Sequence, residues 1–129
     1  GHLLGDEVLI LVSRLLRDNF RSDDRLYRFG GEEFVVMLNT PRGELAARAL
    51  ERLRRKIEDF NFPRVGRLTV SIGFTEVKAS DTPNSAFERA DECVYHAKSN
   101  GRNQTVAYDS LLMSHIVETP QPASEVEFF

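Results

Sequence analysis

Two adjacent carboxylates follow a pair of glycines in the segment Gly30–Gly31–Glu32–Glu33. A glycine pair between β-rich runs favours a tight hairpin turn, because such turns need positive φ angles. A turn without side chains lets a phosphate chain approach the backbone closely, and neighbouring carboxylates supply the oxygen ligands that Mg²⁺ prefers. The same residues would equally suit an ordinary solvated turn. Taken alone, the cluster leaves both interpretations open.

Three further groups of polar residues could do chemistry, and each also has a simpler explanation. Lys98 and Arg102 could grip phosphates, with the lysine as a point charge and the arginine as a fork. Cations near the end of a helix are also favoured by the helix dipole alone. Asp6 could serve as an ordinary N-cap, and Arg21 with Asp24 could form no more than a polar loop.

The elements that would position these residues follow from the hydrophobic periodicity. Apolar residues at helical spacing predict helices, and strict alternation predicts strands. The expected order is helix, hairpin, helix, strand, helix and strand, over residues 6–17, 25–38, 43–59, 67–76, 85–99 and 104–108. The segment 67–76 alternates cleanly, so we expect a half-buried strand there. This order predicts an α+β fold with helices packed on a mostly antiparallel sheet.

The length and composition fit one globular domain, with 129 residues of which 41% are hydrophobic and 29% are charged. A net charge of -3 gives no general reason to expect nucleic-acid binding. The single cysteine, Cys93, cannot form an internal disulfide, and we expect it to pack inside a helix interface. No apolar run approaches the roughly 20 residues of a membrane helix. We therefore expect a cytoplasmic domain without direct membrane contact, although its parent protein could be membrane-anchored.

The C-terminal segment differs from the rest of the chain. Residues 111–129 contain two prolines and no clear period, so we expect a domain over residues 1–110 and a poorly ordered tail over 111–129. One feature of the expected sheet stands out. Four strands, two of them in a hairpin, would pack better with a further strand ahead of the first helix.

Considered together, the polar segments resemble the GGDEF domain of the diguanylate cyclase family in order and spacing. The matching segments are Gly1–His2–x–x–Gly5–Asp6, Arg21–x–x–Asp24, Gly30–Gly31–Glu32–Glu33–Phe34, and the runs 69–73, 90–91 and 95–103. The likeness covers roughly residues 1–108. The element from Gly30 to Phe34 is the Glu variant of the family's namesake, a variant found in active members.

The resemblance implies a fold and an activity. Family members fold like the palm domain of nucleotidyl cyclases and polymerases, and each protomer holds one GTP. Two GTP molecules are condensed into cyclic di-GMP with release of pyrophosphate, with Mg²⁺ or Mn²⁺ as the cofactor. Because one domain holds one GTP, the resemblance implies a homodimer as the active form, with GTP and cyclic di-GMP as ligands and no nucleic-acid partner.

By the same resemblance, each candidate residue takes an implied role. The GTP-binding residues would be Asp6, Gly30, Gly31, Lys98 and Arg102. The two glycines would lie against the phosphates, the two cations would hold the β- and γ-phosphates, and the aspartate would accept hydrogen bonds from the guanine edge.

The remaining implied roles belong to the acids of the hairpin and to the Arg-x-x-Asp segment. Glu32 and Glu33 would be the catalytic and metal-binding residues, with the metal ligand and the base not divided between them. Arg21 and Asp24 match the family's inhibitory site for cyclic di-GMP, which would hold two domains apart.

The sequence also departs from the family's pattern. A strand with an Asp-x-Asp-x-Phe element precedes the first helix in the family, is central in the sheet and carries a metal-binding aspartate. Without it, the sheet would lose a buried middle strand and the metal site would lose a carboxylate, so the fragment could be inactive. The alternative function is a catalytically silent module that binds cyclic di-GMP or GTP as a sensor. A third interpretation is an interaction domain without a nucleotide role.

Overall fold

The computed structural model describes residues 5–29, 31–39, 43–109 and 125–128, and the described elements are three helices and five strands. The helices are α1 (Asp6–Asn19), α2 (Gly43–Asp59) and α3 (Pro83–Ser99). The strands are β1 (Arg25–Arg28), β2 (Phe34–Leu38), β3 (Ile72–Glu76), β4 (Thr105–Ala107) and β5 (Glu125–Phe128).

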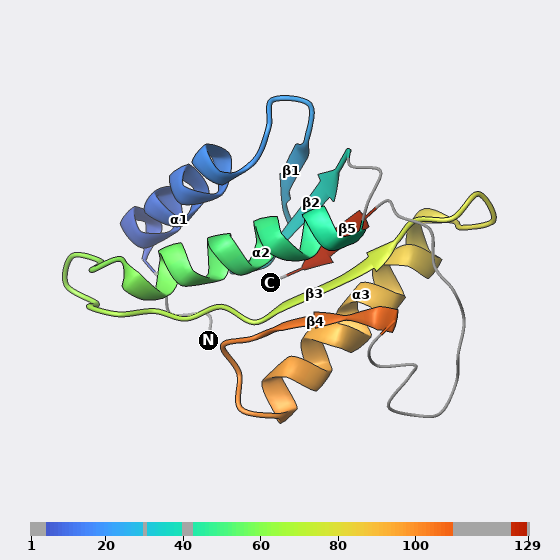
Figure 1. The fold of residues 1–129 in the computed structure, drawn as a ribbon. Coiled ribbons are helices and arrows are strands. Elements are labelled where there is room, and N and C mark those ends of the chain that lie inside the picture. The colour runs from blue at the N-terminus through green and yellow to red at the C-terminus, as the bar shows by residue number, and fades with distance from the viewer. Residues whose placement is uncertain (1–4, 30, 40–42, 110–124, 129) are drawn as a thin grey trace.

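The five strands form one sheet in the order β1-β2-β5-β3-β4 (Figure 1). β1 and β2 are the two antiparallel arms of a hairpin, and β5 runs antiparallel to both β2 and β3. β4 pairs with β3 in the parallel direction. The prediction of an α+β fold with a mostly antiparallel sheet is therefore confirmed.

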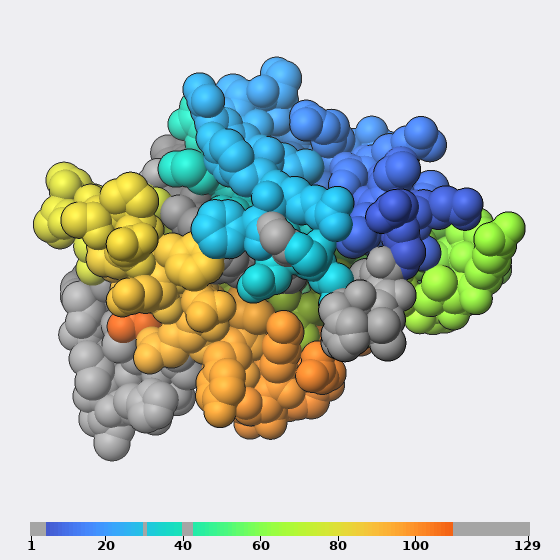
Figure 2. Space-filling model, turned by 180° about the vertical axis from the view of Figure 1, so that it is seen from behind, coloured from blue at the N-terminus to red at the C-terminus, as the bar shows by residue number. Residues whose placement is uncertain are grey.

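Helices cover both faces of the sheet, with α1 and α2 on one face and α3 on the other (Figures 1 and 2). The alternation of side chains along β2 shows how this works. Phe34, Val36 and Leu38 belong to the core cluster shared with α1 and α2. Val35 points the other way and packs against Ala90 and its neighbours on α3. β2 is therefore buried on both faces over Phe34, Val35 and Val36, whereas Met37 is exposed.

The helices form where the apolar stripes predict them. α2 has the predicted bounds and buries Leu50, Leu53 and Ile57 completely. α3 begins at a capping box in which Thr82 and Ser85 each accept from the other's backbone N–H. It starts two residues before the predicted position, because Pro83 is well suited to the first turn of a helix. α1 ends two residues beyond its predicted end.

The predicted half-buried strand over residues 67–76 is wrong in two respects. The strand that forms, β3, is limited to Ile72–Glu76, and all five of its residues are buried. Ile72 and Phe74 face the α1–α2 layer, whereas the Gly73 position lies directly against the backbone of α3. Alternation predicts one solvated face, but here the polar-looking face is covered by a helix.

The centre of the sheet is occupied by β5, which was not predicted. We expected residues 111–129 to be a poorly ordered tail and the middle strand to be missing. Instead, Glu125–Phe128 pairs with β2 on one side and with β3 on the other. For instance, Phe128 is level with both Val35 and Gly73. The rest of that tail lies outside the described residues.

Cys93 lies fully buried in the interface between α3 and β4, as predicted. Burial raises the pKa of its thiol to about 12. In the described part of the chain, none of the helices combines the length and the apolar character that crossing a membrane requires.

Candidate functional site

The hairpin turn between β1 and β2 has an open backbone. The Phe29 N–H donates to the Glu33 carbonyl at 2.7 Å and closes the turn. Gly31 has a φ of +50°, and a methyl group at this position would have no atom within 4 Å. The Arg28 guanidinium donates to the Gly31 carbonyl at 3.1 and 2.8 Å. A ligand could thus reach the backbone at Gly31; Gly30 lies outside the described residues.

The two acids of the turn are accessible. Glu32 is half-buried and Glu33 is exposed. Within the described part of the chain, neither carboxylate accepts a hydrogen bond. Phe34, the next residue, is 3% exposed and belongs to the main core. It therefore fixes the start of β2, while the acids before it stay free for a ligand.

The turn is also anchored to α3. The exposed Phe29 ring packs against the Phe87 ring with a centroid distance of 5.1 Å. Because Phe87 lies in the first half of α3, this contact ties the hairpin to the same helix that carries Lys98 in its last turn. Figure 2 shows the hairpin (cyan) and α3 (gold to orange) on one face of the molecule.

The basic pair stands at the other end of α3. Lys98 is exposed in the last turn of the helix. The helix stops where predicted, with Asn100 as C-cap and Gly101 at a φ of +106°. Arg102 follows with a φ of +61° and an exposed side chain, and its N–H donates to the Ala97 carbonyl at 2.8 Å.

The sheet topology brings the acidic and the basic groups to one edge. Since β5 is antiparallel to both β2 and β3, these two strands run parallel and begin at the same edge. β2 begins directly after Glu32 and Glu33. The turn after α3 reaches the start of β3, because the Ile72 N–H donates to the Gln104 carbonyl at 2.9 Å. Both groups therefore lie where β2 and β3 begin.

Asp6 is not the cap that its position suggests. Gly5 is the N-cap residue of α1, with no side-chain capping hydrogen bond. Asp6 lies in the first turn with its side chain exposed, where its negative charge interacts favourably with the helix dipole. Figure 2 shows the start of α1 (dark blue) on the same face of the molecule as the hairpin (cyan). The capping interpretation is therefore wrong, and the carboxylate has no hydrogen-bond partner among the residues that the structure describes.

The donor set at this edge suits a metal ion that shares its ligands with a substrate. Among the described residues, no group of three or more His, Cys, Asp and Glu side chains is placed to hold a metal ion. Glu32 and Glu33 are nevertheless two adjacent carboxylates that have no hydrogen-bond or ion-pair partner among the described residues. Mg²⁺ in proteins commonly takes one or two carboxylates and completes its shell with water and substrate phosphates. The residues present fit that mode of binding.

A second candidate site lies at the opposite edge, in the loop between α1 and β1. Both oxygens of Asp24 are engaged, since Oδ2 accepts from the Arg21 N–H at 2.9 Å and Oδ1 from the Asn39 N–H at 2.8 Å. The aspartate thus holds the loop against the end of β2. Arg21 is exposed, and no described residue is bonded to its guanidinium.

Two pockets flank this loop, and both contain residues that sequence reasoning missed. One, of about 200 Å³, is lined by Arg21 and Asp24 together with Arg48 and Arg52 of α2. The other, of about 250 Å³, adds arginines from α1 and β1. Arg52 is held by Asn19, whose side-chain and backbone oxygens accept at 2.9 and 3.1 Å. The spacing of α2 on its own gives no sign that its arginines meet a loop almost 30 residues upstream.

The sheet order, the acidic hairpin turn and the basic end of α3 define a palm-like α+β domain of the nucleotidyl cyclase type. The chain belongs to the GGDEF family, because residues 1–104 match the family described as "Diguanylate cyclase, GGDEF domain". The resemblance seen in the sequence and the expected fold class are thereby confirmed.

Several named relatives agree with this assignment. Diguanylate cyclase DgcP of Pseudomonas aeruginosa is 41% identical over 107 residues, which cover 81% of this chain and 16% of that protein. Response regulator PleD of Caulobacter vibrioides is 41% identical over 112 residues, covering 82% of this chain and 25% of that protein. The chain thus spans only about a sixth to a quarter of the length of these relatives.

Solved structures show the same fold. The GGDEF domain of DgcB from Caulobacter crescentus, determined in complex with c-di-GMP, superimposes with a TM-score of 0.75 at 30% identity, covering 80% of this chain and 64% of that one. The active GGEEF domain of a diguanylate cyclase from Vibrio cholerae gives a TM-score of 0.68 at 28% identity, covering 80% and 67%.

Proposed function

We propose that this domain condenses two molecules of GTP into cyclic di-GMP and pyrophosphate. The observation that supports the proposal is that the turn with Glu32 and Glu33 and the turn with Arg102, next to Lys98, both lie toward the edge where β2 and β3 begin. We place the catalytic residues within residues 1–110, and β5, which lies beyond this range, completes the sheet of the domain.

The roles follow from the chemistry of each group. Lys98 and Arg102 bind the β- and γ-phosphates, since both side chains are exposed and carry no competing ion pair among the described residues. The open backbone at Gly31 allows the phosphate chain to lie against the turn. Asp6 accepts hydrogen bonds from the two adjacent N–H donors of the guanine edge.

The reaction is a phosphoryl transfer carried out twice. The 3′-oxygen of one GTP forms a bond to the α-phosphorus of the other, and the bond from that phosphorus to the bridging oxygen of pyrophosphate breaks. The hydroxyl proton passes to a carboxylate of the hairpin turn or to water. When bound, Mg²⁺ or Mn²⁺ supplies neutralisation of the phosphate charge and makes the hydroxyl more acidic. Because each domain holds one GTP, two domains must face each other as a homodimer.

The direct test is to incubate the full chain with GTP and Mg²⁺ over a range of protein concentrations. We expect cyclic di-GMP and pyrophosphate in a 1:2 ratio, and a Glu33→Gln variant that binds GTP but forms product at least about 100-fold more slowly. Glu88→Gln, an exposed acid on α3, is the matched control. GTP binding without product at any concentration that gives dimers would instead identify a silent sensor module.

We further propose that cyclic di-GMP inhibits the enzyme at the loop that carries Arg21. Arg21, Arg48 and Arg52 line one pocket there, and arginine forks suit phosphates and stack on purine faces. The DgcB structure, itself a complex with c-di-GMP, motivates this assignment. Asp24 supports the loop in addition to any contact with the guanine.

The inhibitory site is tested with Arg21→Ala, because this side chain makes no hydrogen bond or ion pair among the described residues. The variant should keep its initial rate while the product concentration needed for half inhibition rises at least about tenfold. Arg14→Ala, an exposed arginine of α1, should leave inhibition unchanged. Undiminished inhibition of the Arg21 variant would remove the proposal.

A further inference from the structure

The turn that follows α3 has a costly backbone conformation. Gly101, Arg102 and Asn103 have φ angles of +106°, +61° and +47° in succession. Glycine adopts this region freely and asparagine tolerates it, but arginine does not favour it. A run of left-handed residues persists only where surrounding contacts impose it. The contacts that hold this turn therefore determine the position of the Arg102 Cα, from which the side chain extends.

Part of the turn is held by its own neighbours. The Gln104 side-chain amide donates to the carbonyls of Asn100 and Arg102 at 2.8 and 3.1 Å. The Arg102 N–H donates back to the end of α3, as described above. These bonds close the turn on itself, but they do not fix its position relative to the rest of the domain.

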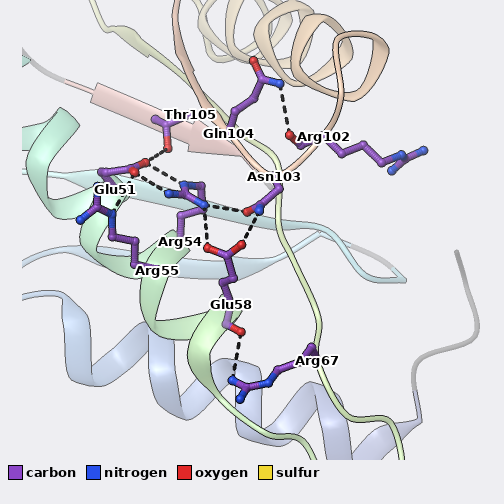
Figure 3. Close-up of polar contacts among 9 residues, drawn as sticks. All are labelled: Glu51, Arg54, Arg55, Glu58, Arg67, Arg102, Asn103, Gln104 and Thr105. Atoms are coloured by element: carbon purple, nitrogen blue, oxygen red, sulfur yellow. Dashed lines mark hydrogen bonds and ion pairs between the residues drawn. The ribbon is translucent and has the colours of Figure 1, made fainter.

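The external support comes from α2, on the other side of the sheet edge. Arg54 Nη1 donates to Asn103 Oδ1 at 2.7 Å, and Asn103 Nδ2 donates to Glu58 Oε2 at 2.7 Å. Arg54 Nη1 also donates to Glu58 Oε1 at 3.2 Å, so the three side chains form a closed ring (Figure 3). Only one orientation of the Asn103 amide satisfies both partners, which makes the link specific.

Arg54 is itself firmly held. Its Nε and Nη2 donate to the two carboxylate oxygens of Glu51 at 2.8 and 2.6 Å, and its side chain is 12% exposed. Thr105 at the start of β4 donates to the same carboxylate at 3.3 Å. The Arg54 guanidinium lowers the pKa of Glu51 to about 2. The pair of Glu51 and Arg54 therefore stays charged at neutral pH.

Arg102 lies outside this network. In Figure 3 its backbone carbonyl accepts from Gln104, while its guanidinium extends away from Arg54 and Glu58. One side of the turn is thus bound to α2, and the other side carries the exposed Arg102 guanidinium, which has no ion pair among the described residues.

We propose that Arg54 and Glu58 are positioning residues for Arg102, because through the side chain of Asn103 they fix the backbone from which Arg102 reaches the triphosphate. This inference rests on the proposed phosphate-binding role of Arg102. Neither residue touches the substrate in this account. They hold the turn in place before GTP binds, so that the Arg102 side chain loses less conformational entropy on binding.

The test uses Asn103→Gly, which removes the link but adopts positive φ without strain, so that the fold is preserved. Binding of 3′-deoxy-GTP with Mg²⁺ is measured by calorimetry, since this analogue lacks the attacking hydroxyl. We expect affinity to fall about tenfold in Asn103→Gly and in Arg54→Ala, and KM for GTP to rise more than kcat falls. Arg55→Ala is the control, because Arg55 is 70% exposed and contacts only Glu51 in this network.

A double-mutant cycle separates positioning from general damage. If Arg54 acts through Arg102, then Asn103→Gly should change affinity by less than about twofold when Arg102 is already alanine. An undiminished tenfold effect in that background, or wild-type affinity of Asn103→Gly alone, would overturn the inference. Should Arg102→Ala itself bind the analogue normally, the proposed phosphate clamp fails first, and the two failures are thereby distinguished.

Discussion

A methyl group added to Gly73 would find no space between β3 and α3. An ideal Cβ at this position would lie 2.5 Å from the Ala90 carbonyl oxygen, 2.6 Å from Cys93 Cβ and 2.6 Å from the Val94 backbone nitrogen. Two of these atoms belong to the helix backbone, so no change of rotamer relieves the clash. To restore ordinary contacts of about 3.5 Å, α3 must move by about 1 Å. Neighbouring strands hold β3 on both sides, so the helix bears the shift.

We therefore expect Gly73→Ala to cost about 3 kcal/mol, the upper part of the range for overpacked cores. With a urea slope of about 1.5 kcal/mol/M, the midpoint of unfolding should fall by about 2 M at an unchanged slope. Gly5→Ala is the control, since a methyl group there meets no atom within 4 Å and its φ is -70°. Its cost should stay below about 1 kcal/mol. A Gly73→Ala protein within about 0.5 kcal/mol of the wild type would refute the close approach of α3.

Three further predictions concern buried ionisable groups. The Arg89 guanidinium donates to both oxygens of Asp81 at 2.7 and 2.6 Å and holds the pKa of that carboxyl well below its usual value. Because the pKa of Asp81 is lowered in the folded state, its ionisation stabilises the fold above about pH 4, and this contribution is lost as pH falls. Asp81→Asn should therefore lower the free energy of unfolding by about 3 kcal/mol at pH 7 and by progressively less in acid. Urea titrations in which the variant and the wild type differ by the same amount at every pH would contradict this. Burial, with a smaller contribution from Asp109, raises the pKa of Glu76, whose Oε2 has no hydrogen-bond partner among the described residues. Because the pKa of this carboxyl is raised in the folded state, its ionisation lowers the stability of the fold as pH rises. Glu76→Gln should therefore increase the free energy of unfolding by about 1 kcal/mol at pH 8 and leave it unchanged at pH 4. A decrease at pH 8 would show that the Glu76 carboxylate stabilises the fold. The thiol of Cys93, with its pKa of about 12, should react with iodoacetamide only after unfolding, and rapid labelling of the folded chain would argue against its burial.

Local patterns predicted the parts of the fold that local physics determines. The bounds of α2 were correct because its apolar stripe is long, and the end of α3 was correct because Asn100 and Gly101 form a strong stop signal. The hairpin followed from its glycine pair. For Asp6, the pattern located the start of the helix but not the cap, which differs by one residue from the polar candidate.

The features that were missed depend on contacts between distant parts of the chain. The sequence of β5 has only four residues and no clear hydrophobic period, so it did not predict a strand. These residues form a strand because they pair with β2 and β3 on either side. The buried polar face of β3 depends on where α3 lies. The bond between Arg54 and Asn103 joins residues 49 positions apart, and the arginines of α2 reach the loop at Arg21 only once the helix has packed. No pattern within a short window records such contacts.

The position of β5 has a mechanical consequence. Among the described strands, β2 and β3 have no ladder in common, so backbone hydrogen bonding across the sheet passes through Glu125–Phe128 alone. A protease that removed this short segment would part the sheet into two ribbons, β1 with β2 and β3 with β4. The amide protons that face the segment from either ribbon would then become exchangeable in a single opening event, and the acidic turn would lose its fixed distance from the end of α3.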